Sequence, residues 1–226
     1  MSNVLKFASI NAKTAVLKAI KRNLSLKEIS QIYVQSAAVI KLLKVLPKEI
    51  PATLLMKSMT NHTFSSLNPD FKSMERLEFL GDAVIEIIVT EHLFENYQDM
   101  DEGQLTKFRA SLVNNKKLSK LARAIKINKC ILSTVPQNLS ADKNLSDALE
   151  ALVGAYYLTY GLIGAKELLH NMFSAYKEKY NEDFMCPTSM DHFDYVTKLI
   201  EWARENKIPL PKYKYSTKKD GKHTVS

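Results

Sequence analysis

The stretch MERLEFLGDAVIEIIVTEHLF, residues 74–94, decides the fold. It contains no proline, and its apolar residues recur at steps of three and four, so it predicts one long helix. Glu78 and Asp82 are four residues apart, which places both carboxylates on one face of that helix. Two carboxylates this close repel each other, so either both lie in water or a cation lies between them.

A second acidic pair occurs in SDALEAL, residues 146–152, where Asp147 and Glu150 are three residues apart and again share a helix face. Leu149 and Val153 give the same helix an apolar side. Each pair taken alone is compatible with a solvated acidic surface. Two such pairs, each on a largely apolar helix, favour a site that binds a cation.

Helical periodicity extends over most of the chain. It covers residues 11–24 and 25–46, where Ser25 and Glu28 form a capping-box signature. No alternating strand pattern occurs before about residue 185, so the sequence predicts an all-α domain with a helical N-terminal extension. Breaks are expected at Asn68-Pro69, at residues 101–103, at residues 136–144, and at Gly161 and Gly164, which would end the helix with the second acidic pair.

Length and composition indicate one substantial globular domain with a small second one, since the chain has 226 residues, 46% of them apolar and 25% charged. It has no run of 18 apolar residues, so we expect no transmembrane helix and no membrane partner. Cys130 and Cys186 are far apart and lack metal-ligand spacing. They indicate packing thiols in a reducing compartment rather than a disulfide framework or a zinc site.

The net charge of +8 is unevenly distributed, with +7 in residues 1–50, +4 in residues 212–226 and −3 between them. Basic ends fit a polyanionic partner and an acidic middle fits a cation site, although surface lysines that only maintain solubility are the alternative. Residues 1–27 lack acidic side chains, as mitochondrial presequences do, but those favour arginine and only Arg22 is present. We expect a nuclear or cytoplasmic protein, with the mitochondrion as the alternative.

Longer motifs make the chain recognisable. ERLEFLGDAVIEIIVTEHLF resembles the signature of the ribonuclease III family, and LLMKSMTNHTFSSLNPDFKS resembles the helix and loop before it, with Asn61-His62 where the family usually has Thr-His. EGQLTKFRASLVNNKKLSKLA and SDALEALVGAYYLTYG follow in the family's order and spacing. The resemblance covers about residues 45–180. It implies a catalytic domain at residues 46–186, preceded by a helical extension at residues 1–45.

The resemblance also implies a site. Glu78, Asp82, Asp147 and Glu150 match the family's catalytic and metal-binding carboxylates. Phosphodiester hydrolysis must activate water and neutralise charge, and Mg²⁺ held by carboxylates does both, with Mn²⁺ expected to substitute. The positions of Glu75 and Glu102 match two further acidic residues, either at the rim of the family's acidic valley or near a partner subunit, and a surface carboxylate is the alternative for each.

Three other positions refine the resemblance. Lys143 and Asn115 are similar to catalytic residues of the eukaryotic single-domain enzymes, including the budding-yeast type of Dicer. Asn114 takes the place of Asn115 if the register differs by one. The alternatives are a solvated lysine at residue 143 and a surface amide at residue 115. Phe79 matches an aromatic residue that inserts into the partner subunit, so a homodimer is implied. A core phenylalanine is the alternative for Phe79.

The tail, residues 187–226, resembles the first half of a double-stranded-RNA-binding domain, with a helix, a strand in YKYST and a turn at Asp220-Gly221. Thr197, Glu201 and His223 match positions that reach the RNA minor groove. The remaining strands and the C-terminal helix are missing, so this α/β domain is incomplete. We expect such a half-domain to be partly disordered or supported by the main domain, and a truncation is the expected reason for its end.

These features together predict a metal-dependent endoribonuclease that cleaves duplex RNA as a homodimer. The family's products, a 5′-phosphate and a 3′-hydroxyl with short 3′ overhangs, are implied by the resemblance. The alternative is a non-catalytic RNA-binding protein with the same fold, of the mitochondrial-ribosomal type. The sequence leaves open whether an enzyme of this kind would serve RNA processing or RNA silencing.

Overall fold

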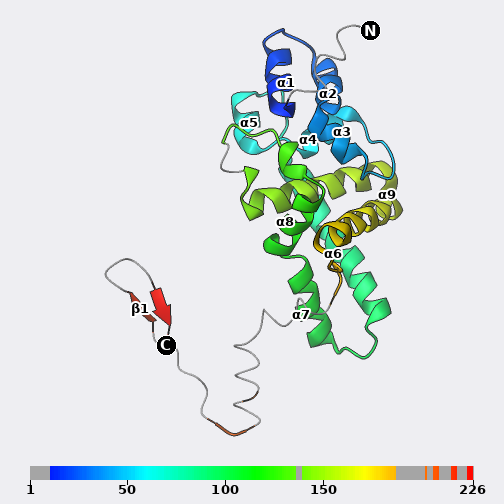
Figure 1. Ribbon diagram of the computed structural model, residues 1–226, viewed down its shortest axis with the longest axis vertical. Coiled ribbons are helices and arrows are strands. Elements are labelled where there is room, and N and C mark those ends of the chain that lie inside the picture. The colour runs from blue at the N-terminus through cyan, green and yellow to red at the C-terminus, as the bar shows by residue number, and fades with distance from the viewer. Residues whose placement is uncertain are drawn as a thin grey trace. The chain divides into compact units, whose positions relative to one another are not determined.

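A computed structural model describes residues 11–135, 139–186, 202, 206–208, 215–217 and 223–225 (Figure 1). The chain divides into two compact units, residues 1–186 and 187–226. The described part of the second unit contains an antiparallel hairpin of β1 (Tyr215–Thr217) and β2 (His223–Val225). Strand β1 falls in the YKYST segment, where the sequence predicts a strand.

The described part of the first unit contains helices joined by turns and loops and no strand, apart from one isolated bridge between Thr60 and Leu132. This confirms the prediction of an all-α domain. The helices are α1 (Ala12–Ile20), α2 (Leu26–Val34), α3 (Ala37–Leu43), α4 (Ala52–Ser58), α5 (His62–Leu67), α6 (Glu75–Asn96), α7 (Glu102–Leu112), α8 (Asn115–Ala124), the 3-10 helix η1 (Ile127–Lys129) and α9 (Asp142–Tyr180).

Helices α6 and α9 cross in the centre of the first unit, and α8 lies against α9 (Figure 1). Two glycines form the crossing. A Cβ atom on Gly81 would lie 1.7 Å from the carbonyl oxygen of Glu150, and one on Gly154 would lie 2.2 Å from the carbonyl oxygen of Leu77. The two main chains are therefore in direct contact, and this contact brings the acidic segment of α6 next to that of α9.

The N-terminal extension differs from the prediction at one point. The Ser25 and Glu28 side chains form the expected capping box at the start of α2. The helix predicted for residues 25–46, however, is interrupted, because Ser36 has an extended backbone (φ −70°, ψ 145°) and begins α3 as its N-cap. The side chain of Ser36 is buried, so the chain bends inward at this residue.

Long-range hydrogen bonds join this extension to the rest of the first unit. The buried hydroxyl of Tyr33 donates to the carbonyl oxygen of Cys130 at 2.8 Å, and the Asn171 amide donates to the carbonyl oxygen of Val45 at 3.0 Å. Burial raises the pKa of the Cys130 thiol to about 12, so it stays protonated as a packing residue.

Helix α9 consists of two helical segments that meet at a kink at Gly161, where the sequence predicts the end of the helix that carries the second acidic pair. Gly161 marks the kink, because its φ of 66° lies in the left-handed region that favours glycine. Gly164, which the sequence also predicts as a helix end, is buried inside the helix. By length and composition α9 could cross a membrane, but 61% of its most apolar window is buried, as in a core helix.

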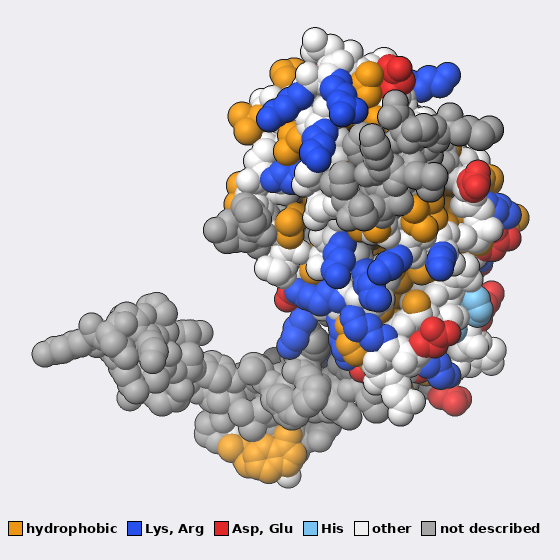
Figure 2. Space-filling model, turned by 45° about the horizontal axis from the view of Figure 1, so that its top comes forward, with side chains coloured by type: hydrophobic (Ala, Val, Ile, Leu, Met, Phe, Trp, Pro, Cys, Tyr) orange, Lys and Arg blue, Asp and Glu red, His pale blue; other side chains and the backbone are white. Residues whose placement is uncertain are grey.

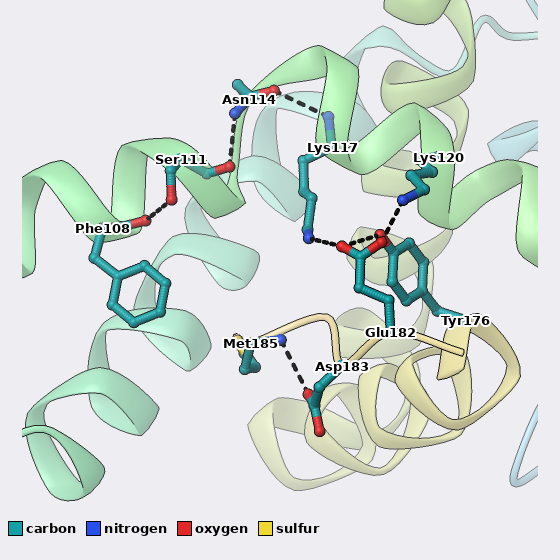
Figure 3. A network of polar contacts seen from close by, with 9 residues as sticks. All are labelled: Phe108, Ser111, Asn114, Lys117, Lys120, Tyr176, Glu182, Asp183 and Met185. Carbon is teal, nitrogen blue, oxygen red and sulfur yellow. Dashed lines mark hydrogen bonds and ion pairs between the residues drawn. The ribbon is translucent and has the colours of Figure 1, made fainter. Parts of the chain in front are cut away.

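The chain after α9 is fixed to α8 by a polar cluster (Figure 3). The Glu182 carboxylate accepts hydrogen bonds from Lys117 at 3.0 Å, Lys120 at 2.5 Å and the Tyr176 hydroxyl at 3.0 Å. Lys117 lies over the rings of Tyr176 and Phe184, and only 10% of its side chain is exposed. Desolvation raises the pKa of Glu182, but the bonds from Lys120, Lys117 and Tyr176 outweigh it and lower the pKa to about 2.

Candidate metal centre

Three carboxylates converge where α6 crosses α9. One oxygen from each of Glu78, Asp147 and Glu150 lies within 4.8 Å of the others. Glu78 comes from the first turn of α6, and the other two come from the second and third turns of α9. Asp147 and Glu150 are each only 7% exposed. The helix crossing therefore collects residues from both sequence-predicted acidic pairs into one half-buried cluster.

Electrostatics in this cluster favours the uptake of positive charge. Desolvation, followed by repulsion from Asp82, Asp147 and Glu78, raises the pKa of Glu150 to about 8. Desolvation also raises the pKa of Asp147, and desolvation together with the Asp147 charge raises that of Glu78. Carboxylates in this state bind either protons or a cation, because either one removes the repulsion between them.

Asp82 occupies a different place from the other three. It lies one turn after Glu78 on α6, its side chain is exposed, and its oxygens fall outside the group of three. It is nevertheless close enough to be the strongest charge acting on Glu150. Asp82 therefore lies at the solvent side of the cluster, where it could approach a cation from the open face.

Lys143 supplies the nearest positive charge. Its ammonium lies 3.1 Å from an oxygen of Asp147 and 3.9 Å from an oxygen of Glu78. The hydrogen bond to Asp147 is the main cause that raises the pKa of Lys143. Its side chain is 70% exposed, so the ammonium is held at the rim of the cluster rather than inside it.

The two neighbouring asparagines have separate roles. Asn114 is the N-cap of α8, and its side chain accepts a hydrogen bond from the backbone N–H of Lys117. Asn115 instead accepts a hydrogen bond at 3.0 Å from the Ser146 hydroxyl, next to Asp147. Of the two positions that the sequence leaves open, Asn115 is the one that contacts the acidic segment of α9, through Ser146.

A polar network that the sequence reading missed holds the first turn of α9. Ser119 donates to Asp142 at 2.7 Å, and the Arg123 guanidinium lies 2.8 Å from the same carboxylate. Arg123 also donates to the carbonyl oxygen of Ser140 at 2.7 Å. Ser119 and Arg123 are four residues apart on α8, so their shared face was visible in the sequence, but their target on α9 was not.

The remaining predicted residues are distributed as follows. Glu75 is exposed in the first turn of α6, and its charge contributes to the raised pKa of Glu78. The Glu102 carboxylate accepts a hydrogen bond from the hydroxyl of Thr106, one turn later on α7. Phe79 is 83% exposed, which excludes a core position within the first unit. Thr197 and Glu201 lie outside the described residues, and only the backbone of His223 is described, at the start of β2.

The fold and the site together define a helical domain whose carboxylate cluster, at a glycine-mediated helix crossing, is suited to a cation. Comparison with known proteins then gives the family. The family model described as Ribonuclease III domain matches residues 75–161. "Ribonuclease 3" of Pelagibacter ubique is 36% identical over 173 residues, which cover 75% of this chain and 72% of that protein. The chain belongs to the ribonuclease III family.

Other matches agree. "Ribonuclease 3" of Campylobacter fetus is 35% identical over 77% of this chain and 75% of that protein. The solved nuclease domain of ribonuclease III from Campylobacter jejuni, described as flexible in a region involved in dimer formation, is 34% identical with a TM-score of 0.56, and the match covers 63% of this chain and 98% of that chain. The chain spans only 55% of the Chlorobaculum tepidum relative and 59% of the Streptomyces coelicolor relative.

Proposed function

We propose that this chain is a metal-dependent endoribonuclease that cleaves duplex RNA as a homodimer and leaves 5′-phosphate and 3′-hydroxyl ends with short 3′ overhangs. The observation that carries the proposal is the convergence of Glu78, Asp147 and Glu150 within 4.8 Å in a member of the ribonuclease III family. Asp82 completes the set from the solvent side.

The donor set fits Mg²⁺, and also Mn²⁺. It consists of carboxylate oxygens from two rigid helices, and Mg²⁺ prefers such oxygens while it keeps several waters. When bound, the ion supplies an activated water and neutralises charge on the phosphate. The residues that would hold it are Glu78, Asp147 and Glu150, with Asp82 as a further ligand, directly or through water.

Two neighbouring side chains would act on the RNA. Lys143 is exposed at the rim, where its ammonium could meet a phosphate oxygen or the charge that develops in the transition state. The Asn115 side chain is held through its oxygen by Ser146, which leaves its amide N–H groups available to donate to a phosphate. The Lys143 ammonium and the Asn115 amide would thus act as two donors to the RNA beside the carboxylates.

The homodimer is supported by Phe79. This residue follows Glu78 directly, yet its ring is 83% exposed. Covering such a ring contributes roughly 1.5–3 kcal/mol, so a subunit contact would explain its position. One centre cuts one strand, and two copies related by two-fold symmetry would cut both.

Several finer assignments are also proposals. The placement of Lys143 and Asn115 beside the cluster supports the eukaryotic single-domain type, including a Dicer-like role, although the relatives compared above are bacterial. The β1–β2 hairpin supports the assignment of residues 187–226 to a double-stranded-RNA-binding fold, in which Thr197, Glu201 and His223 would contact the minor groove. With the eukaryotic type goes a nuclear or cytoplasmic location, which is also part of the proposal.

The test is cleavage of a long duplex RNA in the presence of Mg²⁺ by the wild type and by Glu150→Gln. We expect Glu150→Gln to lose cleavage, whereas the matched control Glu178→Gln, at an exposed carboxylate near the end of α9, keeps it. A dimeric wild type that binds the duplex but cuts nothing refutes the enzyme and favours the structural RNA-binding alternative. Sequencing the fragments separates the two roles, because uniform short products indicate silencing and stem-loop-directed cuts indicate processing.

A further inference from the structure

The first unit contains two segments that are almost free of acidic residues. Between Met1 and Lys48 the only carboxylate is Glu28, and its oxygens accept hydrogen bonds from the backbone and hydroxyl of Ser25. Residues 103–141 contain no acidic residue and eight Lys or Arg. The rest of the chain up to residue 186 carries most of the carboxylates, so positive charge is concentrated in these two segments.

The fold brings the two segments together. Helix α1 contacts α3, α3 contacts η1, and η1 contacts α8, so the elements form a continuous series. The buried hydrogen bond from Tyr33 to the carbonyl oxygen of Cys130 fixes the N-terminal extension beside η1. The series ends in α8, whose first residue, Asn115, accepts a hydrogen bond from Ser146, the neighbour of Asp147 in the chain.

Six lysines of this series have exposed side chains, and none of them forms an ion pair within the part of the chain that the structure describes. On α1 and α3 they follow the faces opposite the buried residues, so they point to solvent. Figure 2 shows a face of the first unit that is rich in Lys and Arg side chains. We call this surface the basic band: Lys18, Lys21, Lys41, Lys44, Lys126 and Lys129.

Lys126 has a second unusual property. Its φ of 60° lies in the left-handed region, where glycine is favoured and a lysine is under strain. The chain thus holds a lysine in an unfavourable conformation at an exposed position in the middle of the band. This residue also provides a substitution that removes charge without a cost to the fold, since glycine suits its backbone.

We propose that the basic band is a second contact surface for duplex RNA. It would bind the phosphate backbone at a distance from the metal centre while one strand of the same duplex lies in the metal centre. The proposal rests on the nuclease function proposed above. Its occupant is a polyanion with evenly spaced phosphates, because the lysines are spread over several elements and form no ion pair with a described carboxylate. Contacts of this kind position a duplex without reading its sequence.

The experiment compares two triple variants of the full chain, each in a Glu150→Gln background that prevents cleavage. The band variant is Lys41→Gln, Lys44→Gln and Lys129→Gln. The matched control is Lys48→Gln, Lys166→Gln and Lys177→Gln, which removes the same charge from lysines that are already paired with Glu167, Glu91 and Asp183. Binding of a long blunt-ended duplex RNA is measured by fluorescence anisotropy over a series of salt concentrations.

We expect the band variant to bind on the order of tenfold more weakly at about 0.1 M salt, and the slope of log K against log salt to fall by up to about three. We expect the control to remain within about twofold of the parent with the same slope. Equal affinity and slope for the band variant and the parent overturn the inference while leaving the nuclease function intact. A parent that neither binds nor, without Glu150→Gln, cuts duplex RNA overturns both.

Two further measurements keep the result interpretable. If the band variant is monomeric in sedimentation while the control is dimeric, the band is a contact between subunits and the RNA inference is wrong. If the band variant loses thermal stability, Lys126→Gly with Lys129→Gln takes its place, because glycine fits the backbone at residue 126. A slope lowered by up to about two in that double variant supports the inference, and an unchanged slope overturns it.

Discussion

Replacement of Glu182 by glutamine tests whether the cluster between α8 and the end of α9 stabilises the first unit. In Figure 3 the carboxylate faces Lys117, Lys120 and Tyr176 together. Glutamine keeps the size and one acceptor oxygen but removes the charge. Lys117, whose side chain is only 10% exposed, would then be a nearly buried ammonium without an anion.

The expected magnitude follows from the pKa of Glu182, which falls from 4.5 to about 2. A shift of this size corresponds to about 3 kcal/mol, since one unit is worth about 1.4 kcal/mol. The Glu182 side chain is 38% exposed, so solvent screening reduces the contribution to roughly 1–2 kcal/mol. The isolated Lys117 adds to this cost, and we expect Glu182→Gln to lower the free energy of unfolding by about 2 kcal/mol.

The pH dependence has a definite sign. Because the pKa of Glu182 is lower in the folded state, its contribution is complete above the unfolded pKa of 4.5 and is lost as the pH falls toward about 2. The wild type and Glu182→Gln should therefore differ most at neutral pH and converge in acid. At neutral pH the midpoint of thermal unfolding should fall by about 4–8 °C.

The assay is urea unfolding of both proteins between neutral pH and pH values near 2, followed by circular dichroism. Asp183→Asn is the matched control, because Asp183 pairs with Lys177 at 3.4 Å between side chains that are 58% and 67% exposed. We expect that change to cost less than about 0.5 kcal/mol. Equal losses for the two variants, or a Glu182→Gln loss that is the same at every pH, would refute the reasoning.

Three other predictions concern single residues. Gly81→Ala should lower the free energy of unfolding by about 3 kcal/mol in urea titrations, because the new methyl meets the carbonyl oxygen of Glu150, whereas a cost below about 1 kcal/mol would contradict the close crossing. Phe79→Ala should shift the dimer toward monomer in sedimentation equilibrium and leave the stability of the monomer within about 0.5 kcal/mol, and an unchanged dimer would contradict the interface role. Lys126→Gly should raise the thermal midpoint by relieving about 1 kcal/mol of backbone strain, which differential scanning calorimetry would detect.

Periodicity alone was sufficient for the helical fold, because apolar positions at steps of three and four mark α1 and α6 directly in the sequence. Periodicity did not predict every helix end, because some helix ends depend on contacts with distant parts of the chain. At Ser36 the helix breaks where the side chain is buried, and of the two glycines predicted to end a helix, Gly161 has the non-helical backbone while Gly164 lies in the segment after it. Neither Ser36 nor Gly164 carries a signal in its immediate neighbours that separates these outcomes.

The candidate site, like the fold, was predictable from the sequence only in part. Spacing placed Glu78 near Asp82 and Asp147 near Glu150, while the match to a family motif was needed to associate the two pairs. Nothing in the spacing indicated that Asp82 would be the exposed member, since that depends on how α6 is rotated against α9. Spacing also gave no reason to connect Arg123 with Asp142, which come together only when α8 lies on α9.

The contact between Gly81 and Gly154 has a consequence for how the centre can change over time. Because main chain meets main chain, the separation of the two acid-bearing helices is set by peptide geometry rather than by the size of core side chains. Substitutions elsewhere in the core could then alter packing without altering the spacing of the cation ligands. Most substitutions around the centre would then leave the ligand geometry unchanged. Substitutions of Gly81 and Gly154 would alter it, although neither residue contributes a functional group.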